Sequence, residues 1–423
     1  MKVQASGSEA VRAVRPLDEG GASRPPSSSP IDQGGASRSP SSSPIAELLR
    51  ERSVLIVVGA GGVGKTTTAA ALAVAATAAG RRVLCLTIDP ARRLAQALGL
   101  EQMSTEAQEI EPDIFLHAGV EVSGRMTVMM LDARAAFDRI VMKHSSSPER
   151  ARRLMHNTLY QHVSTTLSGT QDYMAMETLV AAKSDPRFDL VVLDTPPTAN
   201  ALDFLDAPRR LTDALDSTTT RWLVDHVRKT GKLSLDLFAR SAALVVRGLA
   251  RITGARFLDS VGELVFDLSE LFDGFKERAS RVESALRAPD VSFVLVTSPE
   301  PASIAEVLFL AERLTAAQLA RGAVVVNRVR TLTEPSAALP TQEDVVRAMD
   351  RHGLVLDDDG PARLLRAHAD AVRLASMDRR HLLRLDVPAL EGVPIVEVAE
   401  RDGDIQNLRA LFDLATVLVG SRL

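Results

Sequence analysis

The sequence predicts an α/β fold in which a mostly parallel, doubly wound sheet is interrupted by an inserted all-helical subdomain. Two observations lead to this prediction. Short apolar runs rich in valine, isoleucine and leucine alternate with helical segments over most of the chain. Between Phe204 and Arg287 the alternation stops, and apolar residues recur at spacings of three or four. Near-continuous apolar strands that alternate with helices are typical of parallel sheets covered on both faces.

The predicted strands are seven apolar runs, at residues 54–58, 82–88, 125–131, 189–194, 291–297, 323–327 and 393–398. In sheets of this kind ligands bind at the carboxyl ends of the strands. Lys65, Asp89, Asp194 and Asn327 all lie at or just past such ends. We therefore expect these four side chains to belong to one site.

Domain organisation follows from changes in composition. Residues 1–48 are predicted to be a disordered tail rich in serine, proline and glycine, because Gly20–Ile31 recurs 14 residues later as Gly34–Ile45 with a single change. A short polar duplication cannot bury enough apolar surface to offset the entropy of ordering it. Residues 49–203 and 289–423 are predicted to form the α/β domain, and residues 204–288 the helical insertion, a candidate surface for a client or partner.

Composition excludes several classes of protein. The net charge of −4 gives no electrostatic reason to expect nucleic acid as a partner. One cysteine excludes a disulfide framework and a cysteine-based zinc cluster, and it suits a reducing compartment. No apolar run approaches the ~18–20 residues of a membrane span, and no signal peptide is recognisable. The sequence predicts a cytoplasmic protein without a transmembrane segment.

The most specific motif lies between the first predicted strand and an alanine-rich helix. Residues 59–66 read Gly-Ala-Gly-Gly-Val-Gly-Lys-Thr, the G-x-x-x-x-G-K-[ST] pattern of a phosphate-binding loop. Glycines let successive backbone N–H groups face one anion at the positive end of the helix dipole. Lys65 is expected to reach the β- and γ-phosphates, and Thr66 to bind Mg²⁺. The predicted nucleotide-binding residues are Gly59, Ala60, Gly61, Gly62, Val63, Gly64, Lys65, Thr66, Thr67 and Asn327.

The other strand ends add chemistry to this P-loop NTPase pattern. Asp194 closes a buried strand and is expected to hold Mg²⁺ together with Thr66. Asp89 precedes Pro90, where a carboxylate can orient the attacking water, although capping the next helix is an alternative role. Asn327 can hydrogen-bond an adenine edge or serve as a buried turn residue. We predict Asp89 and Lys65 as catalytic residues of a site for ATP and Mg²⁺.

Four motifs resemble the ArsA-like ATPases, a family that includes the arsenite-pump ATPase and the ATPase for guided entry of tail-anchored proteins (GET). They are the loop at 59–67, the Asp-Pro-Ala-Arg-Arg-Leu run at 89–94, the Asp-Thr-Pro-Pro-Thr-Ala-Asn run at 194–200, and Asn327 within Val-Val-Asn-Arg. The likeness covers roughly residues 50 to 423. It implies that Asp89 activates water, that Thr66 and Asp194 organise Mg²⁺, and that Asn327 binds adenine.

This sequence departs from the family pattern in three places. Ala60 stands where the family has a lysine that reaches the neighbouring subunit's phosphates. Either a partner subunit retains that lysine, or another cation such as Arg92 or Arg93 replaces it. One cysteine cannot supply the metalloid site of the arsenite-pump branch, and the Cys-x-x-Cys zinc clasp of eukaryotic GET ATPases is absent.

Three functional interpretations remain open. The leading one is an ATP-hydrolysing dimeric switch, with low activity on its own, that handles a hydrophobic protein segment. The second is a weakly active regulatory subunit that pairs with a lysine-bearing paralogue, so that the dimer is a heterodimer rather than a homodimer. The third is a positioning ATPase of the ParA/MinD type. The long helical insertion and the lack of a basic patch argue against this third interpretation.

The helical insertion carries an apolar stripe that can be interpreted in two ways. Phe257, Val261, Leu264, Leu268, Phe272 and Phe275 recur at spacings of three or four residues. Such a stripe either packs against neighbouring helices of the same chain or forms a groove for a partner's hydrophobic helix.

Overall fold

The computed structural model describes most of the chain from residue 43 onward. The described residues are 43–88, 92–157, 160–161, 170–195, 201–216, 264, 268, 271–331, 340–355, 357, 359–401 and 403–420. The predictions for other residues, including the duplicated segment as far as residue 42, lie outside the described part of the chain.

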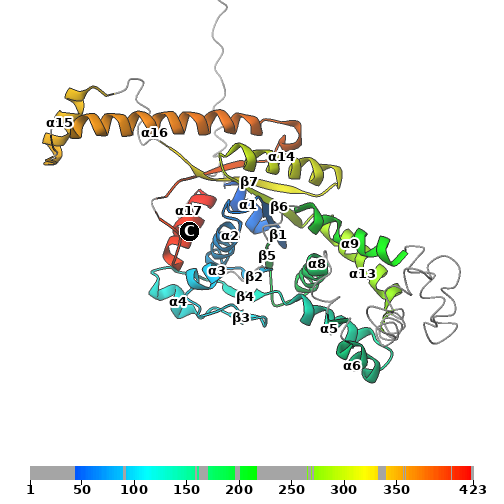
Figure 1. The fold of residues 1–423 in the computed structure, drawn as a ribbon. Coiled ribbons are helices and arrows are strands. Elements are labelled where there is room, and N and C mark those ends of the chain that lie inside the picture. Colours follow the sequence, from blue (N-terminus) through cyan, green and yellow to red (C-terminus); the bar gives the residue numbers. More distant parts are fainter. Residues whose placement is uncertain are drawn as a thin grey trace, which may run out of the picture. The chain divides into compact units, whose positions relative to one another are not determined.

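An eight-stranded sheet runs through the molecule in the order β3-β4-β2-β5-β1-β6-β7-β8 (Figure 1). The strands are β1 (Val54–Gly59), β2 (Arg82–Thr87), β3 (Gln108–Glu109), β4 (Arg125–Met130), β5 (Leu190–Asp194), β6 (Val291–Thr297), β7 (Arg321–Val329) and β8 (Ile395–Ala399). Every pairing is parallel except that of β3 with β4. The predicted α/β fold with a mostly parallel sheet is confirmed.

Helices cover both faces of the sheet. They are α1 (Pro44–Glu51), α2 (Lys65–Ala78), α3 (Arg92–Ala97), α4 (Pro112–His117), α5 (Ala133–His144), α6 (Pro148–His156), α8 (Thr170–Lys183), α9 (Ala201–Asp216), α13 (Phe272–Leu286), α14 (Pro301–Ala316), α15 (Gln342–His352), α16 (Gly360–Leu382) and α17 (Leu408–Val419). None of the helices in the described ranges is both long and apolar enough to span a bilayer.

Two hydrophobic clusters occupy the two faces of the sheet. Successive side chains of β1 alternate between them: Val54, Ile56 and Val58 belong to one cluster, and Leu55 and Val57 to the other. This alternation is the period of two expected of a strand whose faces are both buried. The first cluster lies under α5, α8, α13 and α14, and the second under α1, α2 and α17.

The boundary of the predicted tail is wrong by a few residues. Helix α1 begins at Pro44 and contains Ile45 and Leu48, which are buried in the second cluster. A backbone N–H at the first position of a helix has no hydrogen-bond partner within the helix. Proline suits this position because it lacks that N–H. The end of the second repeat copy therefore starts the folded domain. An amphipathic helix, and not the surrounding Ser/Pro composition, decides the structure at residues 44–48.

The described ends of the predicted helical insertion pack within the chain. Helices α9 and α13 lie side by side and are joined by an ion pair between Lys276 and Asp216 (Figure 1). Leu264 and Phe275 are buried, and the Phe275 ring stacks on Phe137 with ring centres 5.5 Å apart. This end of the apolar stripe thus follows the internal-packing interpretation. Phe257 lies outside the described residues, as does the side chain of Phe272.

Candidate nucleotide-binding site

The predicted phosphate-binding loop connects β1 to α2 at the centre of the sheet. Gly59, Gly62 and Gly64 have φ angles of 154°, 78° and 98°, which side-chain-bearing residues rarely adopt. A Cβ atom on Gly59 would lie 2.0 Å from the carbonyl oxygen of Val296 in the adjacent strand β6. Glycine is therefore required both for the turn and for the close approach of the loop to the sheet.

Lys65 is the first residue of α2, and its side chain folds back over the loop. It is 5% exposed, and its Nζ donates a hydrogen bond of 2.8 Å to the carbonyl oxygen of Ala60. Ala60 itself is buried, with 6% exposure. The structure thus places a buried ammonium group against the glycine-rich loop, where an anionic ligand would find both a charge and backbone donors.

Asp194 reaches the loop because β5 lies between β1 and β2 in the sheet. Its backbone is in register with Val57 on one side and Thr87 on the other. Its buried carboxylate oxygen Oδ2 accepts a hydrogen bond of 2.7 Å from Thr66 Oγ1 and one of 3.1 Å from Thr87 Oγ1. The structure therefore brings Thr66 and Asp194 together, as the pairing of a loop hydroxyl with a strand-end carboxylate requires.

The sequence prediction gives Thr87 no role in this site and includes Thr195 only as part of the run at 194–200. Thr87 ends β2 and shares the Asp194 carboxylate, and Thr195 donates a hydrogen bond of 2.8 Å from Oγ1 to the carbonyl oxygen of Val57. Both residues lie at the ends of strands, a position that can be recognised from the sequence. Their partners, however, depend on β5 being inserted between β1 and β2, and that order is not encoded in local sequence.

Asn327 contacts the phosphate-binding loop directly. Its Nδ2 donates a hydrogen bond of 2.9 Å to the carbonyl oxygen of Val63, and its Oδ1 accepts one of 3.0 Å from the backbone N–H of Arg328. A Cβ on Gly64 would lie 2.3 Å from Nδ2, so glycine at 64 also makes room for this amide. Asn327 braces the loop in this structure, and its contact with adenine stays a prediction.

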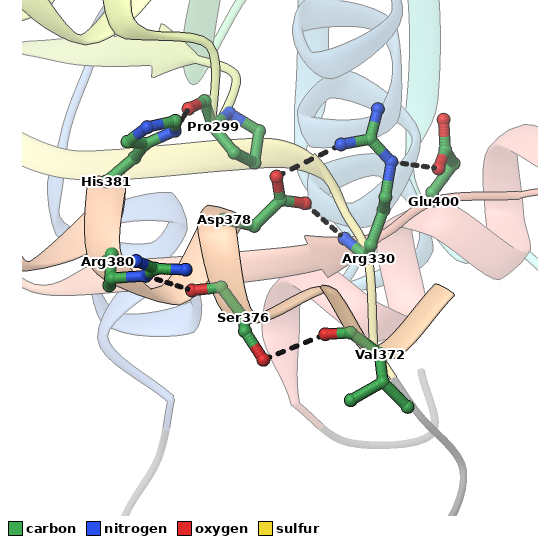
Figure 2. A network of polar contacts seen from close by, with 8 residues as sticks. All are labelled: Pro299, Arg330, Val372, Ser376, Asp378, Arg380, His381 and Glu400. Atoms are coloured by element: carbon green, nitrogen blue, oxygen red, sulfur yellow. Dashed lines mark hydrogen bonds and ion pairs between the residues drawn. The ribbon is translucent and has the colours of Figure 1, made fainter. Parts of the chain in front are cut away.

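A cavity of about 210 Å³ lies beyond Asn327, at the carboxyl ends of β6, β7 and β8. Figure 2 shows the polar network beside it, in which the Asp378 carboxylate accepts hydrogen bonds of 3.0 and 3.1 Å from Arg330. Arg330 also forms an ion pair with Glu400, and His381 contacts the carbonyl oxygen of Pro299. Asp378 and His381 come from α16, and no motif in the sequence connects that helix to the strand ends.

Cys85 of β2 is a buried thiol near the Asp194 carboxylate. Burial, followed by the nearby Asp194 carboxylate, raises the pKa of Cys85 far above its ordinary value. Cys85 is therefore a protonated core side chain and not a nucleophile or thiolate ligand.

Across the described ranges, no cluster of three or more histidine, cysteine or acidic side chains is arranged to hold a metal. The oxygens of Thr66 and Asp194 are a donor set that suits Mg²⁺ in combination with ligand oxygens.

Several predicted site residues lie outside the described part of the chain. Asp89 is one of them, and residues 196–200 of the predicted second switch are others. Helix α3 begins at Arg92, but the side chains of Arg92 and Arg93 are not described. The catalytic role of Asp89 and a substitute cation at 92 or 93 therefore stay predictions.

A comparison with known proteins covers the part of the chain that contains this site. A family model described as anion-transporting ATPase (ArsA_ATPase) matches residues 52–341. The ATPase get3 of Aspergillus terreus is 26% identical over 277 residues, which are 65% of this chain and 72% of that protein. The get3 ATPases of Schizosaccharomyces pombe and Schizosaccharomyces japonicus are 25% and 27% identical over 296 residues, covering 69% of this chain and 78% and 79% of their own. The chain belongs to the anion-transporting ATPase family.

Proposed function

We propose that this chain binds ATP with Mg²⁺ and hydrolyses it as a dimeric molecular switch. The observation that carries the proposal is the convergence of Lys65, Thr66 and Asp194 on the loop, with Thr66 Oγ1 2.7 Å from Asp194 Oδ2. Phosphoryl transfer depends mainly on positioning and on stabilising charge. A buried ammonium, loop N–H groups and a hydroxyl–carboxylate pair are the parts needed for that purpose.

Each residue has a distinct role in the proposed site. Lys65 binds the β- and γ-phosphates, and Thr66 and Asp194 hold Mg²⁺, which neutralises charge on the phosphate oxygens when bound. Asn327 and the cavity next to it receive the adenosine end of the nucleotide. Asp89 orients the attacking water.

The direct test compares ATP binding and steady-state turnover of the wild-type protein with those of Lys65→Ala. Loss of a charge-assisted contact to phosphate is expected to weaken ATP binding about tenfold or more. Arg366→Ala, which removes an exposed cation from α16, is the control and should bind ATP like the wild type. Equal ATP affinity in all three proteins would contradict the proposed site.

A regulatory subunit is the second candidate, and Ala60 is the observation that favours it. The residue is small and buried, so this chain offers no cation at that position of the loop. Ala60→Lys should raise turnover if the missing cation limits hydrolysis; unchanged turnover would favour a substitute cation. Turnover that arises only on mixing with a lysine-bearing paralogue would favour the regulatory subunit and a heterodimer over a homodimer.

The most specific part of the proposal is that the protein binds a hydrophobic client. This binding would use residues of the apolar stripe other than the buried Leu264 and Phe275. Polar substitution of Phe257 and Phe272 is expected to abolish binding of a hydrophobic helix with little change in melting temperature. A large loss of stability would show instead that these side chains are core.

A further inference from the structure

The cavity beside Asn327 has walls from two different parts of the fold. One wall is formed by the ends of β6, β7 and β8 and by the turns that follow them. The other wall is the carboxyl-terminal half of α16, which contributes Leu374, Met377, Asp378 and His381. A ligand that fills this cavity therefore touches α16 and the strand ends at the same time.

Polar contacts around the cavity hold α16 against the sheet (Figure 2). The Asp378 carboxylate, 3% exposed, accepts hydrogen bonds from the backbone N–H and from Nη1 of Arg330, which follows β7. His381 contacts the turn after β6. Arg379 Nη1 lies 2.7 and 2.9 Å from the two carboxylate oxygens of Glu397 in β8. The docking of α16 thus depends on contacts made at the wall of the cavity.

Helix α15 depends on α16 for its position. It packs against α16 and contains no buried residue. In Figure 1, α15 and the start of α16 lie away from the sheet. Leu354 and Val355, which follow α15, are 58% and 95% exposed. A helix of 11 residues is marginally stable without tertiary packing, so the order of α15 should follow the docking of α16.

We infer that α15 and α16, together called the arm, respond to the nucleoside end of ATP in the cavity. Leu374 and Met377 are each 39% exposed and line the cavity, so a nucleobase would cover apolar surface of α16. A ligand that binds only when α16 is docked stabilises the docked state by mass action. The inference rests on the proposed function, which supplies the position of the adenosine, and adds a conformational output to that site.

Hydrogen exchange of the full chain, followed by mass spectrometry, tests this inference with two ligands. AMP-PNP with Mg²⁺ carries both a triphosphate and a nucleoside, whereas tripolyphosphate with Mg²⁺ carries the phosphates alone. Both ligands should slow exchange at the phosphate-binding loop, but only AMP-PNP should slow exchange in α15. At a ligand concentration of about 100 times Kd, exchange that requires undocking of α16 should slow by up to about 100-fold.

The pattern of protection separates this inference from the proposed function. If AMP-PNP protects the loop but not α15, the inference fails and the nucleotide site stands. Equal protection of α15 by tripolyphosphate also overturns the inference, because the nucleoside would then not be the cause. Protection of α15 without the loop would support the arm's response and contradict the proposed triphosphate site. Absence of protection in both places contradicts both proposals.

Variants on α16 test the anchoring by Asp378. Asp378→Asn keeps the shape of the side chain but removes its charge, so α15 should exchange faster in the ligand-free protein. Arg373→Gln is the matched control on the same helix, because the Arg373 side chain is 72% exposed and does not line the cavity. It should leave the exchange of α15 and its response to AMP-PNP unchanged. Equal exchange of α15 in Asp378→Asn and wild type would refute the anchoring on which the inference depends.

Discussion

At the scale of single residues, one carboxylate oxygen joins two elements beside the phosphate-binding loop. Asp194 Oδ2 accepts hydrogen bonds from threonines on two different elements, Thr66 of α2 and Thr87 of β2. Hydrogen bonds to a buried carboxylate hold its orientation and keep its charge stabilised. Thr87 is therefore expected to position Asp194 for Mg²⁺, without touching the nucleotide itself.

Thr87→Val should consequently impair Mg²⁺ use more than ATP binding. Valine has nearly the same shape as threonine but removes the donor to Asp194, a change expected to lower metal affinity about tenfold. The measurement is turnover as a function of Mg²⁺ concentration at saturating ATP. Thr87→Ser keeps the hydroxyl and should behave like the wild type. Equal Mg²⁺ dependence in Thr87→Val and wild type would rule out this positioning role.

The glycines of the loop are expected to differ in their tolerance of substitution. Gly59→Ala places a Cβ 2.0 Å from the Val296 carbonyl oxygen, whereas a Cβ on Gly62 meets nothing within 4 Å. Gly62→Ala should therefore cost only the strain of its positive φ, about 1–2 kcal/mol. Gly59→Ala should cost distinctly more, because a backbone atom has to move. Urea unfolding compares the two, and similar losses would contradict the close approach of loop and sheet.

At the scale of elements, an ion pair joins the amino-terminal ends of β2 and β5. The side-chain hydrogen bonds from Arg82, followed by its backbone N–H, lower the pKa of Asp189 to about 2. The unfolded carboxyl has a pKa near 3.9. The folded-state pKa is the lower one, so the stabilisation is present above about pH 4 and is lost as the pH falls toward 2.

Asp189→Asn should remove this pH dependence. The difference in unfolding free energy between wild type and variant is expected to be constant above about pH 5 and to shrink below about pH 4. Both side chains are 37–49% exposed, so the difference should be small and should fall further in high salt. Urea unfolding across the acidic range measures it. A difference that stayed constant down to about pH 2 would show that the pair does not stabilise the fold.

Helices and strands were predictable from the sequence wherever the apolar residues follow a clear pattern. The valine-rich strands β1, β5 and β6 are buried on both faces and need no long-range information to be recognised. The two-residue strand β3 has no such pattern, because its Gln108 and Glu109 side chains are exposed. Helix α1 was concealed by the repeat that overlaps its first residues.

The candidate site was predictable only in part, for a related reason. Lys65 and Thr66 lie within one contiguous motif, and Asp194 ends a recognisable strand. Thr87 contacts Asp194 only because of the order of the strands in the sheet. Arg330 and Asp378 meet beside the cavity only because of where α16 packs. Tertiary neighbours of this kind come from parts of the chain that local sequence does not connect.

At the scale of the whole molecule, Phe275 of α13, within the predicted helical insertion, packs into the main core. It is 3% exposed, it stacks on Phe137 of α5, and its ring edge faces Tyr173 of α8. Phe275→Ala should lower the unfolding free energy by about 3–5 kcal/mol. Phe309→Ala is the matched control at 50% exposure, expected to change stability by about 0.5 kcal/mol or less. A small loss in Phe275→Ala would mean that the insertion is not coupled to this core.

The alanine-rich helix α2 has a consequence for how the protein is made. Residues 69–76 are all buried, because α2 is enclosed between the sheet and α17, which lies near the other end of the chain (Figure 1). Strand β1 likewise lies between β5 and β6, and both of its edges are paired only when these later strands are present. On the ribosome, the loop and α2 emerge long before the elements that enclose them. The proposed pocket for the triphosphate is therefore expected to form only late in synthesis, so that ATP would bind the finished chain and not the growing one.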